Sequence, residues 1–124
     1  MHRIAVLSEN EMEKQRYAEQ ITRFCEANGL FSQIMQYDDQ ERFFEIAQKD
    51  APTNAIIALS GVAGLNAVEH LRSLCPACRI IWCSDLDFSL QAFRLRADYF
   101  MLKPIDPESL RQGLSVWLKE KTQQ

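Results

Sequence analysis

The sequence predicts one α/β domain built on a parallel sheet, and three observations lead to that fold class. Apolar runs alternate with longer amphipathic stretches from one end of the chain to the other, the pattern of repeated strand–helix units. Residues 4–7 and 55–59 are nearly all apolar, as expected of strands buried on both faces of a parallel sheet. A length of 124 residues, with 47% hydrophobic and 25% charged residues, suits a single core, so we expect residues 1–124 to form one domain.

Local signals support the elements of the first half of the chain. Residues 11–27 place apolar side chains in a helical stripe and end at Asn28-Gly29, a helix-stop signal. Residues 31–35 mix polar and apolar positions, which is typical of an edge strand. The expected strands are residues 4–7, 31–35, 55–59, 80–83 and 98–101.

Acidic residues mark the starts of two further helices. Asp38 and Asp39 follow the edge strand, and we expect them to cap the next helix. Asp106 before Pro107 is a strong helix-start pattern, since aspartate caps a helix and proline suits its first position. Right-handed crossovers with helices on both faces predict the flavodoxin-like strand order 2-1-3-4-5. The expected helices are residues 11–27, 39–48, 65–74, 88–95 and 107–119.

The charge of the chain bears on its partners. A formal net charge of −3 and a pI near 5.4 do not suggest nucleic-acid binding, which depends on clustered lysine and arginine. We therefore expect no direct nucleic-acid contact by this domain.

The first apolar stretch is too short for a signal peptide, and no run approaches the roughly 20 residues of a transmembrane helix. We expect a soluble, cytoplasmic protein without a membrane partner.

The cysteine spacing raises the question of a redox or zinc site. Cys75-Pro76-Ala77-Cys78 has the spacing used in thiol exchange or in half of a zinc site. A redox pair gains its lowered thiol pKa at a helix amino terminus, whereas this pair follows an expected helix and precedes an expected strand. Cys25 and Cys83 add no second paired spacing. We therefore expect turn and core thiols, with no metal and no cofactor.

The most informative motif closes the fifth expected strand. Pro104 fixes its own φ and holds Lys103 extended at the carboxyl end of a strand, which is the ligand edge of an open α/β sheet. Residues 97–105, together with Ser84 after the fourth strand, resemble the receiver domain of response regulators, the CheY-like family. The following helix, Gln91-Ala92-Phe93-Arg94-Leu95, is similar to the fourth helix of receivers from LytTR-type transcription regulators.

The resemblance implies a phosphorylation site at this edge and also shows where the chain departs from it. In receivers, acidic residues after the first strand and an aspartate ending the third hold Mg²⁺, and that aspartate accepts phosphate. Here Ser8 and Glu9 stand at the acidic pair, and Leu59 stands at the acceptor. Residues 60–65 contain no Asp or Glu either. We therefore expect a degenerate phosphorylation pocket without catalytic residues or metal, composed of Ser8, Glu9, Leu59, Ser84 and Lys103.

The expected function is a phosphorylation-independent signalling or regulatory module that is not an enzyme. It would contact a protein partner or a second copy through its fourth helix, fifth strand and fifth helix, because aromatic and arginine side chains dominate interfaces. One alternative is the amino-terminal receiver of a longer LytTR-type DNA-binding regulator. Another is a small-molecule binder or enzyme that uses the vacated pocket. The expected contact residues are Phe93, Arg94, Arg96, Phe100 and Trp117, of which Phe93 and Trp117 also suit an apolar core.

Overall fold

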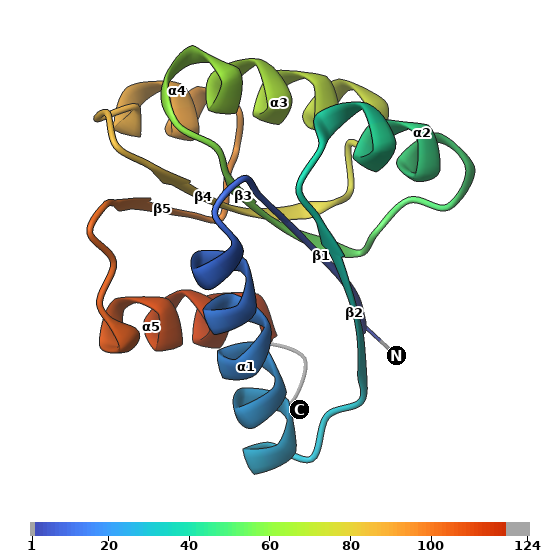
Figure 1. Ribbon diagram of the computed structural model, residues 1–124, viewed down its shortest axis with the longest axis vertical. Helices are drawn as coiled ribbons and strands as arrows, with labels where there is room; N and C mark the ends of the chain where they lie inside the picture. The colour runs from blue at the N-terminus through green and yellow to red at the C-terminus, as the bar shows by residue number, and fades with distance from the viewer. Residues whose placement is uncertain (1, 119–124) are drawn as a thin grey trace.

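The computed structural model describes residues 2–118, in which five parallel strands form one sheet with the order β2-β1-β3-β4-β5 (Figure 1). This is the predicted fold class and strand order. The elements are β1 (His2–Ser8), α1 (Glu11–Ala27), β2 (Ser32–Tyr37), α2 (Gln40–Lys49), β3 (Asn54–Ala58), α3 (Gly61–Leu74), β4 (Arg79–Ser84), α4 (Ser89–Arg94), β5 (Tyr99–Leu102) and α5 (Pro107–Leu118).

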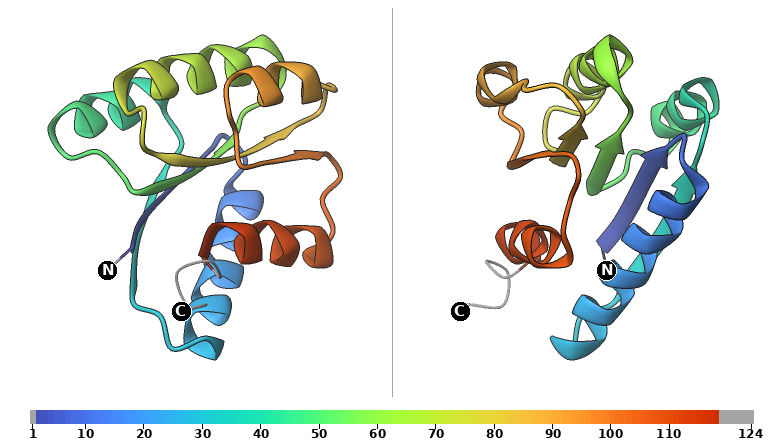
Figure 2. Two further views of the ribbon diagram at one scale, coloured as in Figure 1. Left: turned by 180° about the vertical axis from the view of Figure 1, so that it is seen from behind. Right: turned by 60° about the vertical axis from the view of Figure 1, so that its left-hand side comes forward.

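The helices cover the sheet from both sides, with α1 and α5 on one face and α2, α3 and α4 on the other (Figure 2). Alternate residues of each strand serve the two faces, because successive side chains of a strand point in opposite directions. In β1, Ile4 and Val6 pack with α1 and α5, whereas Ala5 and Leu7 pack under α2 and α3. This explains why the central strands are almost wholly apolar, as predicted.

Strand positions match the prediction, and only their ends differ. The mixed strand β2 lies at one edge of the sheet, as expected, and α1 has the expected bounds. Asp39 caps α2 through a hydrogen bond from the Glu41 backbone N–H to its carboxylate (3.0 Å). Asp38 does not share this role, and its carboxylate lies 4.0 Å from the ammonium of buried Lys14.

Helix α3 begins at Gly61, four residues before the predicted start, and this prediction was therefore wrong. Gly61 has a φ of +63°, a conformation that glycine adopts at little cost. Gly64 lies inside the helix, at a position that requires glycine because a Cβ there would come 2.4 Å from the Leu59 carbonyl oxygen. Gly61 therefore permits the turn into the helix, and Gly64 permits close packing of the helix on the residue after β3.

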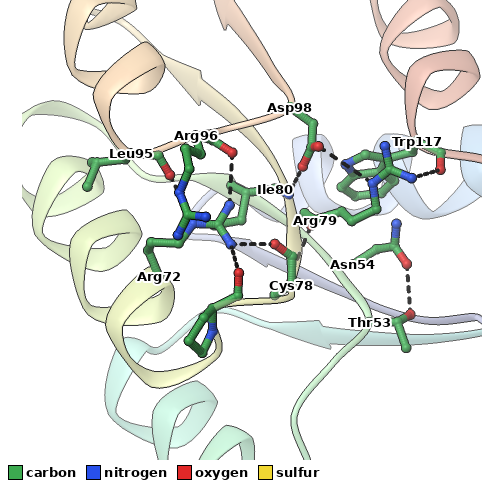
Figure 3. Close-up of polar contacts among 11 residues, drawn as sticks. Thr53, Asn54, Arg72, Cys78, Arg79, Ile80, Leu95, Arg96, Asp98 and Trp117 are labelled. Atoms are coloured by element: carbon green, nitrogen blue, oxygen red, sulfur yellow. Dashed lines mark hydrogen bonds and ion pairs between the residues drawn. The ribbon is translucent and has the colours of Figure 1, made fainter.

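Helix α4 is held at its carboxyl end by Arg72 of α3. The helix is one residue shorter at each end than predicted and closes with hydrogen bonds from the Arg96 N–H to Phe93 O and from the Ala97 N–H to Ala92 O. These bonds form a Schellman motif with Arg96 in the left-handed position (φ +57°). The Arg72 guanidinium donates to four backbone carbonyls within 3.0 Å, those of Leu95, Arg96, Pro76 and Cys78 (Figure 3).

Helix α5 starts as predicted, since the Asp106 carboxylate accepts a hydrogen bond from the Ser109 N–H (2.7 Å). Its predicted last residue, Lys119, lies outside the described residues. Trp117 is fully buried among α1, α5 and the sheet, so its proposed place in a contact surface was wrong. Its carbonyl accepts a hydrogen bond from Arg79, which also pairs with Asp98 (Figure 3).

Between residues 2 and 118, no helix combines the length and apolarity needed to cross a bilayer.

Candidate functional site

A polar cavity of about 410 Å³ opens at the carboxyl edge of the sheet, above β1, β3 and β5. The carboxyl ends of the strands meet there because all five strands run in the same direction. Glu9 and Lys103 of the predicted pocket line this cavity, together with four residues that the sequence did not single out. These four are Asn10, Glu13, Ala58 and Ser60.

The charge of Lys103 is neutralised inside the pocket. Its ammonium nitrogen lies 3.1 Å from Glu13 Oε1, and the Ser8 hydroxyl donates to the same oxygen at 3.2 Å. The Lys103 and Glu13 side chains are only 18% and 25% exposed, so water screens this pair less than a surface ion pair. Ser8 is fully buried. The predicted members Ser8 and Lys103 are therefore brought together by a glutamate that the prediction lacked.

Local capping places Glu13 in this position. Asn10 is the N-cap of α1, and its side-chain oxygen accepts a hydrogen bond from the Glu13 N–H (2.9 Å). The Asn10 N–H in turn donates to Ser8 Oγ (3.1 Å). The Asn-x-x-Glu spacing resembles a capping box, a signal that could have drawn attention to Glu13. It could not have revealed Lys103 as the partner, 90 residues away.

A second carboxylate, that of Asp85, occupies the amino terminus of α3. Asp85 Oδ1 accepts a hydrogen bond from the Gly61 N–H (2.9 Å) and lies 3.4 Å from the hydroxyl of buried Ser84. The bond from Gly61 is the main reason that the pKa of Asp85 lies below its ordinary value. Ser84 Oγ also accepts from the Leu86 N–H (3.2 Å), so this predicted pocket hydroxyl is engaged in the turn after β4.

Leu59 directly follows β3, but its side chain belongs to the core. It is 1% exposed and packs in the cluster formed with α2, α3 and α4, while its neighbours Ala58 and Ser60 line the cavity. The predicted grouping of Leu59 with the pocket side chains is corrected in this respect. The sheet edge presents no acidic side chain from this segment, since residues 54–65 contain neither Asp nor Glu.

Comparison with known proteins gives matches in structure alone. No family model matches the chain, and no curated protein matches it by sequence. The response regulatory domain of protein mrkE from Klebsiella pneumoniae superposes with a TM-score of 0.78 at 15% identity, over 98% of this chain and 99% of that chain. The REC domain of AraT, a response regulator from Geobacillus stearothermophilus, gives 0.75 at 23% identity, over 99% and 98%.

A third structure, a two-component transcriptional regulator from Clostridium phytofermentans ISDg, gives a TM-score of 0.69 at 25% identity over the full length of both chains. This chain has the CheY-like receiver fold. The resemblance that the strand motifs indicated is therefore confirmed for the fold, and it extends over the whole domain.

The receiver fold implies a Mg²⁺ site at this edge, and the residues present do not fit one. Mg²⁺ is a hard ion that is held mainly by carboxylate oxygens and water. The cavity offers the carboxylates of Glu9 and Glu13, and Glu13 is paired with Lys103. Within residues 2–118, no three His, Cys, Asp or Glu side chains are grouped so that they could hold a metal ion.

Exposed apolar side chains occur in the segment after β4, on α4 and at the end of β5. We define the α4 surface as Leu86, Leu90, Phe93 and Leu102, which are 49%, 57%, 81% and 51% exposed. Beneath it, buried Trp82 stacks on Phe88 (centroids 5.2 Å apart) and meets Phe100 edge-on (5.5 Å). Of the predicted contact residues, Phe93, Arg94 and Arg96 are exposed, Phe100 is partly buried, and Trp117 lies in the core.

The cysteines lie in the core or in a turn, as predicted. All four are unpaired and buried. Burial raises the pKa of Cys78 and of Cys83 to about 12, and it also raises the pKa of Cys75. A thiol that stays protonated at neutral pH is a weak nucleophile, which argues against a thiol-exchange role for the Cys75–Cys78 pair.

Proposed function

We propose that this chain is a receiver-fold signalling module that acts by protein contact and does not accept phosphate. The observation that carries the proposal is the ion pair between Lys103 and Glu13, because it satisfies the cation that would otherwise be available to an incoming anion. The apolar Leu59 at the end of β3 supports it further, since leucine has no nucleophilic oxygen. We propose that the domain works in the cytoplasm as a regulator and not as an enzyme.

The contact would form on the α4 surface, with Arg94 and Arg96 beside it. Exposed aromatic and arginine side chains are the residue types that dominate the energetics of protein interfaces. Phe93 supports this assignment most directly, because 81% of an apolar side chain lies open to solvent. The partner would be a second copy of the chain or another signalling protein, and the acidic chain gives no support to nucleic acid.

Two alternatives have different support. A receiver domain within a longer LytTR-type regulator would use the same surface, and the similar Clostridium phytofermentans protein is a two-component transcriptional regulator. An enzyme or small-molecule binder using the pocket has weaker support. The amine of Lys103 and the carboxylate of Glu13 are bonded to each other, and the buried hydroxyls of Ser8 and Ser84 are engaged in local hydrogen bonds.

The test combines intact-mass measurement with sedimentation, each with and without acetyl phosphate and Mg²⁺. We expect no phosphoryl adduct and no effect of acetyl phosphate on association. Phe93→Asp should weaken association by about tenfold or more, as expected of an interface hot spot. Phe31→Asp is the matched control, because Phe31 is 79% exposed and lies beside the opposite edge strand β2.

Two results would contradict the proposal. One is a stoichiometric, base-labile adduct at the carboxyl edge of the sheet. The other is a wild type that stays monomeric while a confirmed partner binds Phe93→Asp with unchanged affinity, which would move the contact surface elsewhere.

A further inference from the structure

We propose that Glu13 and Asp85 act as internal anions that hold the α4 surface in one conformation without any added ligand. This inference rests on the proposed function, since it names how the contact surface is kept in place. Glu13 and Asp85 are positioning residues, and each neutralises a group at the carboxyl edge that would otherwise attract an external anion.

The first group is the Lys103 ammonium. Glu13 contacts it at 3.1 Å, and the Ser8 hydroxyl keeps the same Glu13 oxygen in place at 3.2 Å. Lys103 is also tied through its backbone, because its N–H donates to Ser84 O (2.8 Å). Glu13 therefore links α1 to Lys103, the residue that directly follows Leu102 of the α4 surface.

The second group is the amino terminus of α3, a helix of 14 residues. Free N–H groups at a helix start attract negative charge. Within the described chain, the side chain of the N-cap residue Ser60 does not satisfy them. Asp85 does so from 24 residues away, by accepting from the Gly61 N–H at 2.9 Å. The ammonium of Lys103 acts on Asp85 as well, since its charge contributes to the lowered pKa of that carboxyl.

These two contacts reach the α4 surface through a short covalent path. Asp85 immediately precedes Leu86, and the chain then runs through Phe88, which stacks on Trp82, into α4. The Asp85–Gly61 bond therefore ties the segment that leads into α4 to the start of α3. Asp87 accepts a hydrogen bond from the Ser89 N–H (3.0 Å) where α4 begins, and Arg72 holds the far end of the helix independently. Removing the two carboxylates should release the start of α4 and the end of β5 while leaving the carboxyl end of α4 in place.

The test compares the amide NMR spectra of the wild type with those of Glu13→Gln/Asp85→Asn. Both changes keep the side-chain shape and remove the charge. The matched control is Glu11→Gln/Asp38→Asn, which removes two acids from the same edge that contact Lys14 instead. The control removes both acidic partners of buried Lys14, so we expect it to shift amides near Lys14 and to leave those of residues 85–90 and 100–103 at their wild-type positions. We expect the double variant to shift the amides of residues 85–90 and 100–103.

Titration with inorganic phosphate at constant ionic strength then provides a readout that a purely structural role would not move. In the double variant, phosphate should perturb the Gly61 and Lys103 amides and return those of α4 toward their wild-type positions. Its apparent affinity should be about tenfold higher than in the wild type, as expected when charge-assisted partners become free.

The inference is overturned if the double variant superimposes on the wild type, or if the wild type binds phosphate as tightly as the double variant does. If the double variant does not fold, the single changes Glu13→Gln and Asp85→Asn decide by the same criteria. Failure here is distinct from failure of the proposed function. If the spectra of the double variant are unchanged while Phe93→Asp still weakens association, only the role of the internal anions is contradicted. A phosphoryl adduct on the wild type contradicts the proposed function itself.

Discussion

The pocket at the carboxyl edge and the α4 surface are neighbours along the chain. They differ in whether their side chains already have partners within the domain. Ser84 and Asp85 lie at the end of β4 on the same sheet edge as the pocket, and Leu86 begins the α4 surface. At this edge, Lys103 is paired with Glu13, and Asp85 accepts a hydrogen bond from the Gly61 N–H. On the α4 surface, the four apolar residues remain 49–81% exposed.

This difference indicates where new contacts can stabilise a complex. A ligand entering the pocket must first displace an ion pair or hydrogen bonds already made, so it gains little net free energy. A partner that covers the α4 surface removes apolar area from water and breaks no contact in doing so. The comparison therefore favours binding at the surface over chemistry in the pocket, and four stability measurements test it.

The largest effect is expected for Leu59→Asp, which places a carboxylate directly after β3. The free energy of unfolding should fall by about 3 kcal/mol or more, because a buried leucine is lost and a charge is placed in the core. Lys103 cannot compensate freely, since Glu13 already pairs with it. Urea unfolding measures the change.

Leu59→Met is the volume-conserving control and should cost less than about 1.5 kcal/mol. An equal or higher urea midpoint for Leu59→Asp, with an unchanged slope, would show that the pocket is prepared for an anion after all. The contrast between pocket and surface would then fail.

Arg72→Ala should have the next largest effect, a loss of about 2 kcal/mol, because four backbone carbonyls lose a charged donor. Arg72→Lys should recover only part of this, since one ammonium cannot reproduce the planar fork of donors. Hydrogen exchange at Leu95 and Arg96 would report the loosened end of α4. Exposed Arg94→Ala is the control, and equal costs for Arg72→Ala and Arg94→Ala would show that Arg72 does not support the surface.

Gly64→Ala tests the tight packing behind the pocket and should cost about 1–3 kcal/mol. Alanine favours a helix by about 1 kcal/mol, but a Cβ only 2.4 Å from the Leu59 carbonyl oxygen forces the backbone to move. Gly113→Ala in α5 is the matched control, because its nearest neighbour is a Tyr99 side-chain atom at 3.0 Å. Thermal unfolding that ranked Gly113→Ala as the more damaging change would contradict this view of α3.

The smallest effect is expected for Arg96→Gly, which should stabilise the fold by about 0.5–1 kcal/mol. Arg96 holds the left-handed position of the Schellman motif, where glycine carries no Cβ penalty. Association through the α4 surface should weaken at the same time if the Arg96 side chain contacts the partner. A destabilised variant would show that the arginine side chain supports α4 in a way that its backbone geometry does not explain.

Much of this architecture could be predicted because its causes are local. Alternating apolar and amphipathic runs predicted the fold class and the positions of the strands, and the stripe with Asn28-Gly29 predicted the bounds of α1. The Lys103-Pro104 motif and Ser84 predicted the receiver fold. These patterns have periods of 2 or 3.6 residues, or lie within one turn, so neighbouring residues are enough to recognise them.

The bonding within the site depended on the tertiary structure. Glu13 and Lys103 are 90 residues apart, and Asp85 and Gly61 are 24 residues apart. Only the parallel sheet brings the segments that carry these residues to one edge. Trp117 carries the same aromatic signal as Phe93, yet one is fully buried and the other 81% exposed. Residue type alone thus determined which side chains could fill a core, bind an anion or contact a partner. Which role each one takes was decided by the partners that the fold places beside it, because burial and pairing are properties of contacts between distant segments.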